Sequence, residues 1–289
     1  MTRPHVLFVG IDGVRYDTVR ELDTPALDRV AAAGFLQPVR VNAAGPTISG
    51  PSWSTMVTGV LPPTHRIFNN ELTGHDLGRY PDFITLARRA DPDLQHFIGA
   101  DWEPLVTSRN GGPIFAGGGF LPDRRRGKEA TTADWHDGDQ QVTDRAADHL
   151  AKLDSAAGSV TFAYQLGVDS AGHRHGVGEV YREFVVAADR RLGQLLEAVD
   201  SRPDRDREDW LIIVATDHGH LDEGGHGGDS PEERTAWIAA CGVEVPVTDG
   251  PLLLEQADVA GQVHHVLGLD DHPEAFVGLP FGTRTAPAA

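Results

Sequence analysis

Residues 211–220 read LIIVATDHGH, a run of apolar and mostly β-branched side chains that ends in Asp217, His218 and Gly219. Short apolar runs that stop at turn residues are typical of strands buried on both faces, as in a parallel sheet. We therefore predict a central strand at Leu211–Thr216. Ligands of open α/β sheets bind beyond the carboxyl ends of the strands, and Asp217 and His218 follow there.

The same combination of an apolar strand and an acidic residue occurs twice more. His5–Val9 is predicted as a buried strand followed by Asp12, and Val160–Leu166 as a strand that delivers Asp169. Helical patterns alternate with these runs, which indicates an α/β domain with a parallel sheet. The other predicted elements are the strand Gln95–Gly99 and the helices Pro25–Ala33 with Thr24 as N-cap and Gly34 as stop, Pro51–Thr58, Asp82–Arg89, Gln140–Leu153 and Tyr181–Val199.

The composition bounds the size of the domain and the kind of partner. A chain of 289 residues that is 40% hydrophobic suffices for one large α/β domain. Its net charge of −18 argues against a nucleic-acid polymer or an anionic membrane as partner. No apolar stretch approaches the ~20 residues of a membrane span. The start MTRPHVLFVG shows no export signal, so we expect a cytoplasmic protein. Cys241 is the single cysteine, which excludes an internal disulfide and a zinc-thiolate cluster.

Seven residues in five short segments offer ligands for divalent metal ions. Carboxylate oxygen and neutral imidazole are the donors that hold such ions. A pair of ions beside a hydroxyl is the arrangement that activates an attack on phosphorus. We therefore predict two adjacent metal sites; the three histidines favour zinc, and manganese or iron would also suit. The predicted ligands are Asp12, Ser49, Asp169, His173, Asp217, His218 and His226.

Each segment also has an ordinary explanation. Asp12 can be a turn or capping residue, Ser49 a turn serine, and His226 a loop histidine. Asp169 and His173 have the i, i+4 spacing of a shared ligand pair, but also that of a solvated pair. Ser49 precedes the predicted helix Pro51–Thr58, whose backbone N–H groups favour an anion. The hypothesis rests on the complete set, because chance seldom produces all seven in this order.

The order of these motifs resembles the alkaline phosphatase superfamily, and within it the type I phosphodiesterase/nucleotide pyrophosphatase branch. The segment PTISGP (46–51) is similar to the one that holds the nucleophile of the branch. The stretch TMVTGVLPPTHRIFNN (55–70) is similar to the next motif, which ends in an asparagine. The resemblance covers Val6–Gly228, and Ala257–Gly268 resembles the final helix of the family. It implies a three-layer α/β/α sandwich with a mostly parallel sheet and a small irregular cap, as a single catalytic domain over residues 1–289.

Carried over position by position, the resemblance implies a role for each residue. Ser49 attacks phosphorus, and the phosphoseryl intermediate is then hydrolysed. Asn70, with Asn69 as a weaker substitute, and the backbone N–H groups near Ser49–Gly50 stabilise charge on the nonbridging oxygens. The branch usually has threonine where this chain has Ser49. The implied ligands of one metal are Asp169, His173 and His226, and those of the other are Asp12, Ser49, Asp217 and His218.

From the motifs and the resemblance together, we expect a two-metal phosphoric ester hydrolase that acts on a small-molecule phosphate ester. A phosphodiesterase or nucleotide pyrophosphatase is the leading hypothesis, and a phosphomonoesterase acting on a small metabolite is the alternative. No third-metal acidic set is evident, which favours diesters. A sulfatase is disfavoured because Ser49–Trp53 lacks the arginine of the C/S-x-P-x-R motif. A non-catalytic metal-binding protein is disfavoured because the ligand set is complete.

Residues 100–136 differ from the rest of the chain. They are rich in glycine and contain Trp102, Trp135 and the run Arg124–Arg126. We expect an irregular insertion, either a cap over the site or a surface excursion. The tryptophans would stack on a base or sugar, or cover a small core; the arginines would meet a distal phosphate or face solvent. His220 and His175 are expected at the surface more than beside the ligands, and Arg284–Ala289 as a loose tail.

Overall fold

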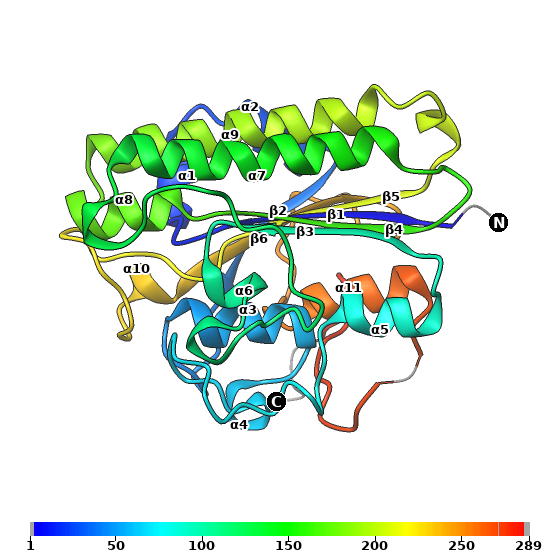
Figure 1. Cartoon of the computed structure of the whole chain (residues 1–289), viewed down its shortest axis with the longest axis horizontal. Helices are drawn as coiled ribbons and strands as arrows, with labels where there is room; N and C mark the ends of the chain where they lie inside the picture. The colour runs from blue at the N-terminus through cyan, green and yellow to red at the C-terminus, as the bar shows by residue number, and fades with distance from the viewer. Residues whose placement is uncertain (1–2, 271, 286–289) are drawn as a thin grey trace.

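The computed structural model describes residues 3–270 and 272–285. They form one six-stranded sheet with helices packed around it (Figure 1). The strand order is β2-β6-β5-β1-β4-β3. Strands β3, β4, β1 and β5 are parallel, and β6 is antiparallel to both of its neighbours. The predicted mostly parallel sheet is confirmed. The strands are β1 (His5–Ile11), β2 (Gly34–Arg40), β3 (Gln95–Ala100), β4 (Ser159–Gln165), β5 (Trp210–Ala215) and β6 (Thr235–Gly242).

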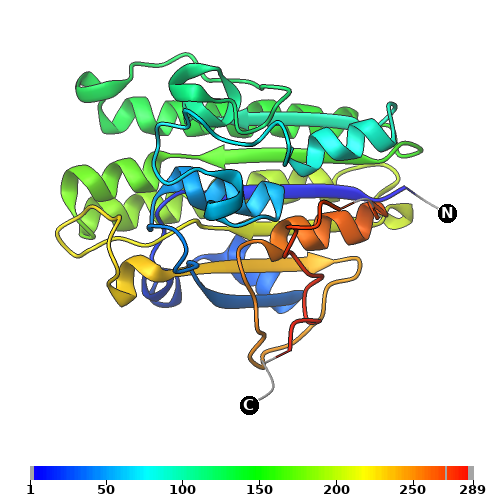
Figure 2. The ribbon, with the colours of Figure 1, turned by 90° about the horizontal axis from the view of Figure 1, so that it is seen from below.

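Helices cover both faces of the sheet, so the expected three-layer sandwich is also confirmed (Figures 1 and 2). Side chains alternate along each strand. On β5, Leu211 and Ile213 join one hydrophobic cluster, and Ile212 and Val214 join the other. The first cluster packs against α3 (Ser49–Thr58), α5 (Phe83–Ala90) and α11 (Asp258–Leu267), and the second against α2 (Pro25–Ala32), α7 (Thr132–Lys152), α8 (Gly167–His175) and α9 (Glu179–Asp200).

Most predicted elements lie within a few residues of their expected bounds, with instructive differences. Helix α3 begins at Ser49 rather than Pro51, so Ser49 is its first residue. Helix α7 begins at Thr132, well before the predicted start, because Thr131 and Asp134 form a capping box. Thr24 does stand at the N-cap of α2, but its side chain makes no capping hydrogen bond.

Strands β2 and β6 were not predicted. Gly34, expected to stop a helix, is the first residue of β2, and the strand contains Pro38. Arg284 forms ion pairs with Asp258 and Glu255, so the expected loose tail is wrong at this residue. The rest of the tail from residue 286, and residues 1–2 and 271 of the expected domain, lie outside the described residues. In the described chain, no helix has the length and apolarity needed to cross a membrane.

The sheet register brings the ends of three strands to one edge. Ile11 of β1 pairs with Gln165 of β4, and Gly10 of β1 pairs with Ala215 of β5. The next residues along each strand direction are therefore neighbours in space: Asp12 after β1, the start of α8 after β4, and Asp217 after β5. Parallel pairing alone thus gathers side chains that are far apart in the sequence.

Candidate active site

One group of polar side chains surrounds His218, which is fully buried. Its Nε2 atom lies 3.1 Å from Asp217 Oδ2, 3.6 Å from Asp12 Oδ1 and 3.3 Å from Ser49 Oγ. Asp12 and Asp217 are completely buried, and Ser49 is 5% exposed. The residues that the resemblance assigns to one metal therefore meet at a single point.

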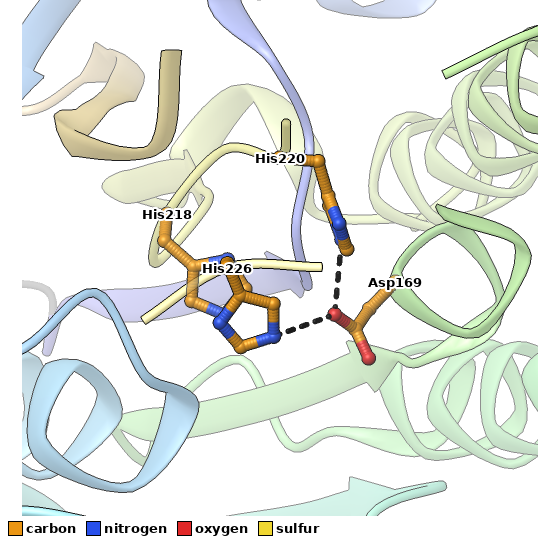
Figure 3. A group of neighbouring side chains, drawn as sticks. All are labelled: Asp169, His218, His220 and His226. Atoms are coloured by element: carbon orange, nitrogen blue, oxygen red, sulfur yellow. Dashed lines mark hydrogen bonds and ion pairs between the residues drawn. The ribbon is translucent and has the colours of Figure 1, made fainter. Parts of the chain in front are cut away.

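A second group forms around Asp169 on α8. Asp169 Oδ1 lies 3.4 Å from both His173 Nε2 and His226 Nε2, and these two nitrogens are 3.0 Å apart. The stacked rings of His218 and His226, with centroids 3.7 Å apart, join the two groups. Figure 3 shows Asp169 and His226 pointing toward each other beside His218. All seven predicted ligands thus lie in one continuous cluster.

The backbone fixes which ring nitrogen of each histidine faces the site. His226 Nδ1 lies 2.6 Å from the Thr47 carbonyl oxygen, and His218 Nδ1 lies 3.0 Å from that of Gly219. A carbonyl oxygen can only accept a hydrogen bond, so both Nδ1 atoms carry the hydrogen, and in the neutral rings both Nε2 atoms present lone pairs to the cluster. Metal-binding histidines are commonly oriented in this way by a carbonyl at the other nitrogen.

His220 belongs to the cluster, although it was expected at the surface. It is fully buried, and its Nε2 atom is 3.1 Å from Asp169 Oδ1 (Figure 3). The Gly225 N–H donates to His220 Nδ1, so the proton of the neutral ring is on Nε2 and is donated to Asp169. His220 therefore orients Asp169 and, in this tautomer, has no lone pair for a metal ion. The surface expectation is wrong because the turn after β5 folds back under α8.

Two aromatic side chains orient Asp12 and were not singled out from the sequence. Trp53 Nε1 and the Tyr164 hydroxyl both donate to Asp12 Oδ2. Asp12 Oδ1 is left buried without a hydrogen-bond partner among the described residues, and so is Asp217 Oδ2. Buried carboxylate oxygens of native proteins are nearly always satisfied. These two atoms, both beside His218 Nε2, are therefore candidate metal ligands.

The charges of the cluster favour cations. Burial raises the pKa of Asp12 to about 7, and the carboxylate of Asp169 adds to the rise. Burial next to Asp12 also raises the pKa of Asp217, and burial lowers the pKa of His218. Burial opposes ionisation of Asp169, but the hydrogen bond from His220 and the interactions with His226 and His173 outweigh it and lower the pKa of Asp169. A crowded set of buried carboxylates beside imidazoles fits divalent ions, which would neutralise the carboxylates.

We expect zinc to raise the thermal unfolding temperature of chelator-treated protein. Ligation stabilises the folded state by about 4 kcal/mol per ion at a thousandfold excess over Kd, which corresponds to roughly 8 °C or more. Asp217→Asn should reduce this gain. Without metal it should leave stability unchanged or higher, because it removes a buried carboxylate crowded by Asp12.

Differential scanning fluorimetry with and without zinc measures both effects. Asp148→Asn is the control, since Asp148 is exposed on α7, and it should change neither melting temperature. A metal-free Asp217→Asn protein that is clearly less stable than metal-free wild type would contradict the metal assignment.

The backbone around Ser49 combines the start of a helix with a glycine that packs closely against the segment containing Asn69 and Asn70. Ser49 opens α3, where N–H groups lack helical partners and favour an anion. The Gly50 N–H, which we expected to face the substrate, instead donates to Asn70 Oδ1 at 2.8 Å. This bond fixes the amide of Asn70, and its Nδ2 remains a donor. A Cβ at Gly50 would lie 2.3 Å from the Asn69 carbonyl oxygen, so the position requires glycine.

The glycine-rich segment 100–136 folds irregularly, with the short helix α6 (Glu103–Val106) and the first residues of α7. A cavity of about 600 Å³ lies between this segment and α8, and it extends to His173. Arg124 and Arg126 form ion pairs with the buried Asp101, so two members of the run contact the protein and only Arg125 is mainly solvated. Trp135 is buried, and both tryptophans line the cavity.

Curated proteins and solved structures resemble parts of this chain. The catalytic subunit of GPI ethanolamine phosphate transferase 3 from Mus musculus is 37% identical over 135 residues, which are 45% of this chain and 11% of that protein. The Homo sapiens protein is 37% identical over 84 residues, 29% of this chain and 7% of that protein. The matched region is thus a small part of these much longer relatives.

Two solved structures share the fold. A 2-O GAG sulfatase superposes with a TM-score of 0.70 and 14% identity, covering 96% of this chain and 73% of that one. Murine ectonucleotide pyrophosphatase/phosphodiesterase 5 gives a TM-score of 0.64 and 16% identity, covering 93% and 96%. Both have alkaline phosphatase-like folds. The family model for type I phosphodiesterase/nucleotide pyrophosphatase matches residues 6–230. The chain therefore belongs to the type I phosphodiesterase/nucleotide pyrophosphatase family.

Proposed function

We propose that this protein is a two-metal hydrolase of phosphoric diesters with Ser49 as its nucleophile. The family and the fold place it among enzymes that act on phosphoesters. The observation that carries the finer proposal is the position of Ser49 Oγ, 3.3 Å from His218 Nε2. The same nitrogen lies beside two carboxylate oxygens that have no hydrogen-bond partner in the described structure. Its substrate would be a small-molecule phosphate ester rather than a nucleic-acid polymer, given the charge of −18.

The residues of the cluster fit two divalent ions. Asp12, Ser49, Asp217 and His218 would hold one, and Asp169, His173 and His226 the other. When bound, two such ions would lower the pKa of the attacking hydroxyl and offset the negative charge that develops during the reaction. Zinc suits the three histidines, and manganese or iron would also fit.

The protein's own groups position the reactants. Ser49 Oγ forms a bond to phosphorus as the bond to the leaving alkoxide breaks, and the serine proton is lost to solvent. Water then forms a new bond to phosphorus, the bond to Ser49 Oγ breaks, and the serine is regenerated. Asn70 Nδ2 donates to a nonbridging oxygen, where negative charge develops. Trp53 and Tyr164 keep Asp12 in place throughout.

A phosphotransferase is a second candidate, favoured by the GPI ethanolamine phosphate transferase 3 relatives. The phosphoseryl intermediate has two fates: attack by water gives hydrolysis, and attack by an alcohol gives transfer. Adding a primary alcohol to the assay and analysing products by ³¹P NMR separates the two. We expect hydrolysis to dominate, and a new phosphate ester as the main product would assign a transferase instead.

A panel of aryl esters tests the proposal. With zinc or manganese, bis(p-nitrophenyl) phosphate is expected to give a higher kcat/KM than p-nitrophenyl phosphate, and p-nitrophenyl sulfate the lowest. A monoester dianion needs one more positive contact than a diester, and in the described chain the metal-ligating side chains form two groups, without a third. Preference for the monoester would support the phosphomonoesterase alternative. Turnover of the sulfate alone would refute the proposal.

A further inference from the structure

Helix α8 carries two adjacent stripes of side chains. Asp169 and His173 are four residues apart and belong to the candidate active site, whereas Ser170 and Arg174, with the same spacing, line the 600 Å³ cavity. Residues four apart on a helix lie one above the other, so the stripes run side by side. His173 lines the cavity as well. The cavity is thus a direct extension of the site.

The wall opposite α8 comes from the segment that follows β3. Trp102 and Pro104 give it an apolar surface, and Arg126 and Asp101 give it charge. Asp101 is buried and already paired, since Arg124 Nε lies 2.6 Å and Arg126 Nη1 2.8 Å from its carboxylate. Glu103 is likewise engaged by Arg109 at 2.7 Å. The acidic groups of the cavity are therefore neutralised by arginines within the segment.

Arg174 differs from these arginines. Its Nη1 and Nη2 donate to the carbonyls of Ala130 and Lys128, and its guanidinium lies 4.8 Å from the centroid of the Trp135 ring. Across the described ranges it forms no ion pair with a carboxylate. Its carbonyl bonds and the ring hold the side chain in place without cancelling its charge. A positive group is thus fixed at the cavity of a chain whose net charge is −18.

We propose that this cavity binds the substituent of the phosphate ester, and that the substituent carries a second anionic group, a carboxylate or a phosphate, which Arg174 contacts. The inference rests on the proposed function, because it takes the phosphoryl group to lie at Ser49. A guanidinium recognises either anion by charge-assisted hydrogen bonds. Trp102 and Pro104 would contact the carbon skeleton between the two charges.

Non-hydrolysable phosphonates test this proposal by binding rather than turnover. Zinc-loaded protein is titrated calorimetrically with alkylphosphonates of increasing length that end in a methyl, a carboxylate or a second phosphonate. At the best length, an anionic end is expected to bind about tenfold more tightly than the methyl end. The preference should weaken as salt is raised. Comparing the two anionic ends shows whether carboxylate or phosphate is preferred.

Three substitutions test whether Arg174 causes the preference for an anionic end. Arg174→Gln should abolish it, and Arg174→Lys should retain part of it by keeping the charge. Arg125→Gln is the control: Arg125 is an arginine of the segment opposite α8, but its side chain is 63% exposed and does not line the cavity, so the preference should persist. Equal affinity of wild type for all ends, or a preference that survives Arg174→Gln, would overturn the inference.

Failure of the inference is distinguishable from failure of the proposed function. If the proposed function is wrong, bis(p-nitrophenyl) phosphate is not turned over through Ser49, whatever the tail of a phosphonate does. If the inference alone is wrong, aryl ester turnover persists and still depends on Ser49, while tail charge has no effect on binding. Arg174 is exposed, so we expect its variants to melt near the temperature of wild type. Such melting temperatures would show that a loss of binding does not come from unfolding.

Discussion

Replacing Ser49 by alanine is expected to lower kcat for bis(p-nitrophenyl) phosphate by roughly 10⁴-fold or more. Without its nucleophile, an enzyme that works through a covalent intermediate keeps only the catalysis supplied by binding and electrostatics. Ser49 Oγ is a suitable nucleophile because it is placed at the start of α3 and faces His218 Nε2. Steady-state kinetics with the zinc-loaded proteins measures the loss.

Ser52→Ala is the matched control for this substitution. Ser52 lies on the same helix, is equally buried, and its hydroxyl has no hydrogen-bond partner in the described structure. It should keep wild-type turnover. Ser49→Thr should retain substantial activity, because threonine supplies the same hydroxyl and is the usual nucleophile of the branch. If Ser49→Ala stays within about tenfold of wild type, water attacks phosphorus directly and the phosphoseryl intermediate is wrong.

The strands at the centre of the sheet were predictable because burial on both faces leaves a continuous apolar run. Leu211–Thr216 shows this pattern, and β5 is completely buried. Strand β6 is buried from Ala236 to Cys241, but its sequence TAWIAACG is rich in alanine, which has a low preference for strands. Strand β2 has a mixed burial pattern and contains proline. Both segments form strands because they pair with neighbouring strands of the sheet, and their local sequence does not reveal this pairing.

The candidate ligands were predictable because each follows a strand or belongs to a motif. The groups that orient them were not. In the sequence, Trp53 and Tyr164 resemble ordinary core aromatics. A buried indole or phenol needs a hydrogen-bond partner, but the sequence does not reveal which residue that partner is. Here the partner of both is Asp12, which is distant from each along the chain. His220 lies in a turn without periodicity, so only the folded backbone reveals its contact with Asp169.

The hydrogen bond between Gly50 and Asn70 changes which group beside Ser49 is expected to contact the phosphate. Because the Gly50 N–H is already donated to Asn70 Oδ1, we propose the Asn70 amide nitrogen, rather than the Gly50 N–H, as the donor to a nonbridging oxygen. Asn69 has a different partner: its Oδ1 accepts from the Glu71 N–H at 2.8 Å. Asn69 and Asn70 are adjacent and chemically identical, but the structure gives them different hydrogen-bond partners.

Substitution of Asn70 should reduce kcat by about 10²–10³-fold, the usual effect of losing one donor to developing charge. Asn70→Asp should be the more severe change, since aspartate still accepts from Gly50 N–H but replaces the donor with a negative charge facing the phosphate. Asn70→Ala should be milder, because it frees the Gly50 N–H to donate in its place. Asn69→Ala should leave kcat unchanged. Equal losses at Asn69 and Asn70, or an aspartate variant as active as alanine, would show that the amide does not contact the reacting group.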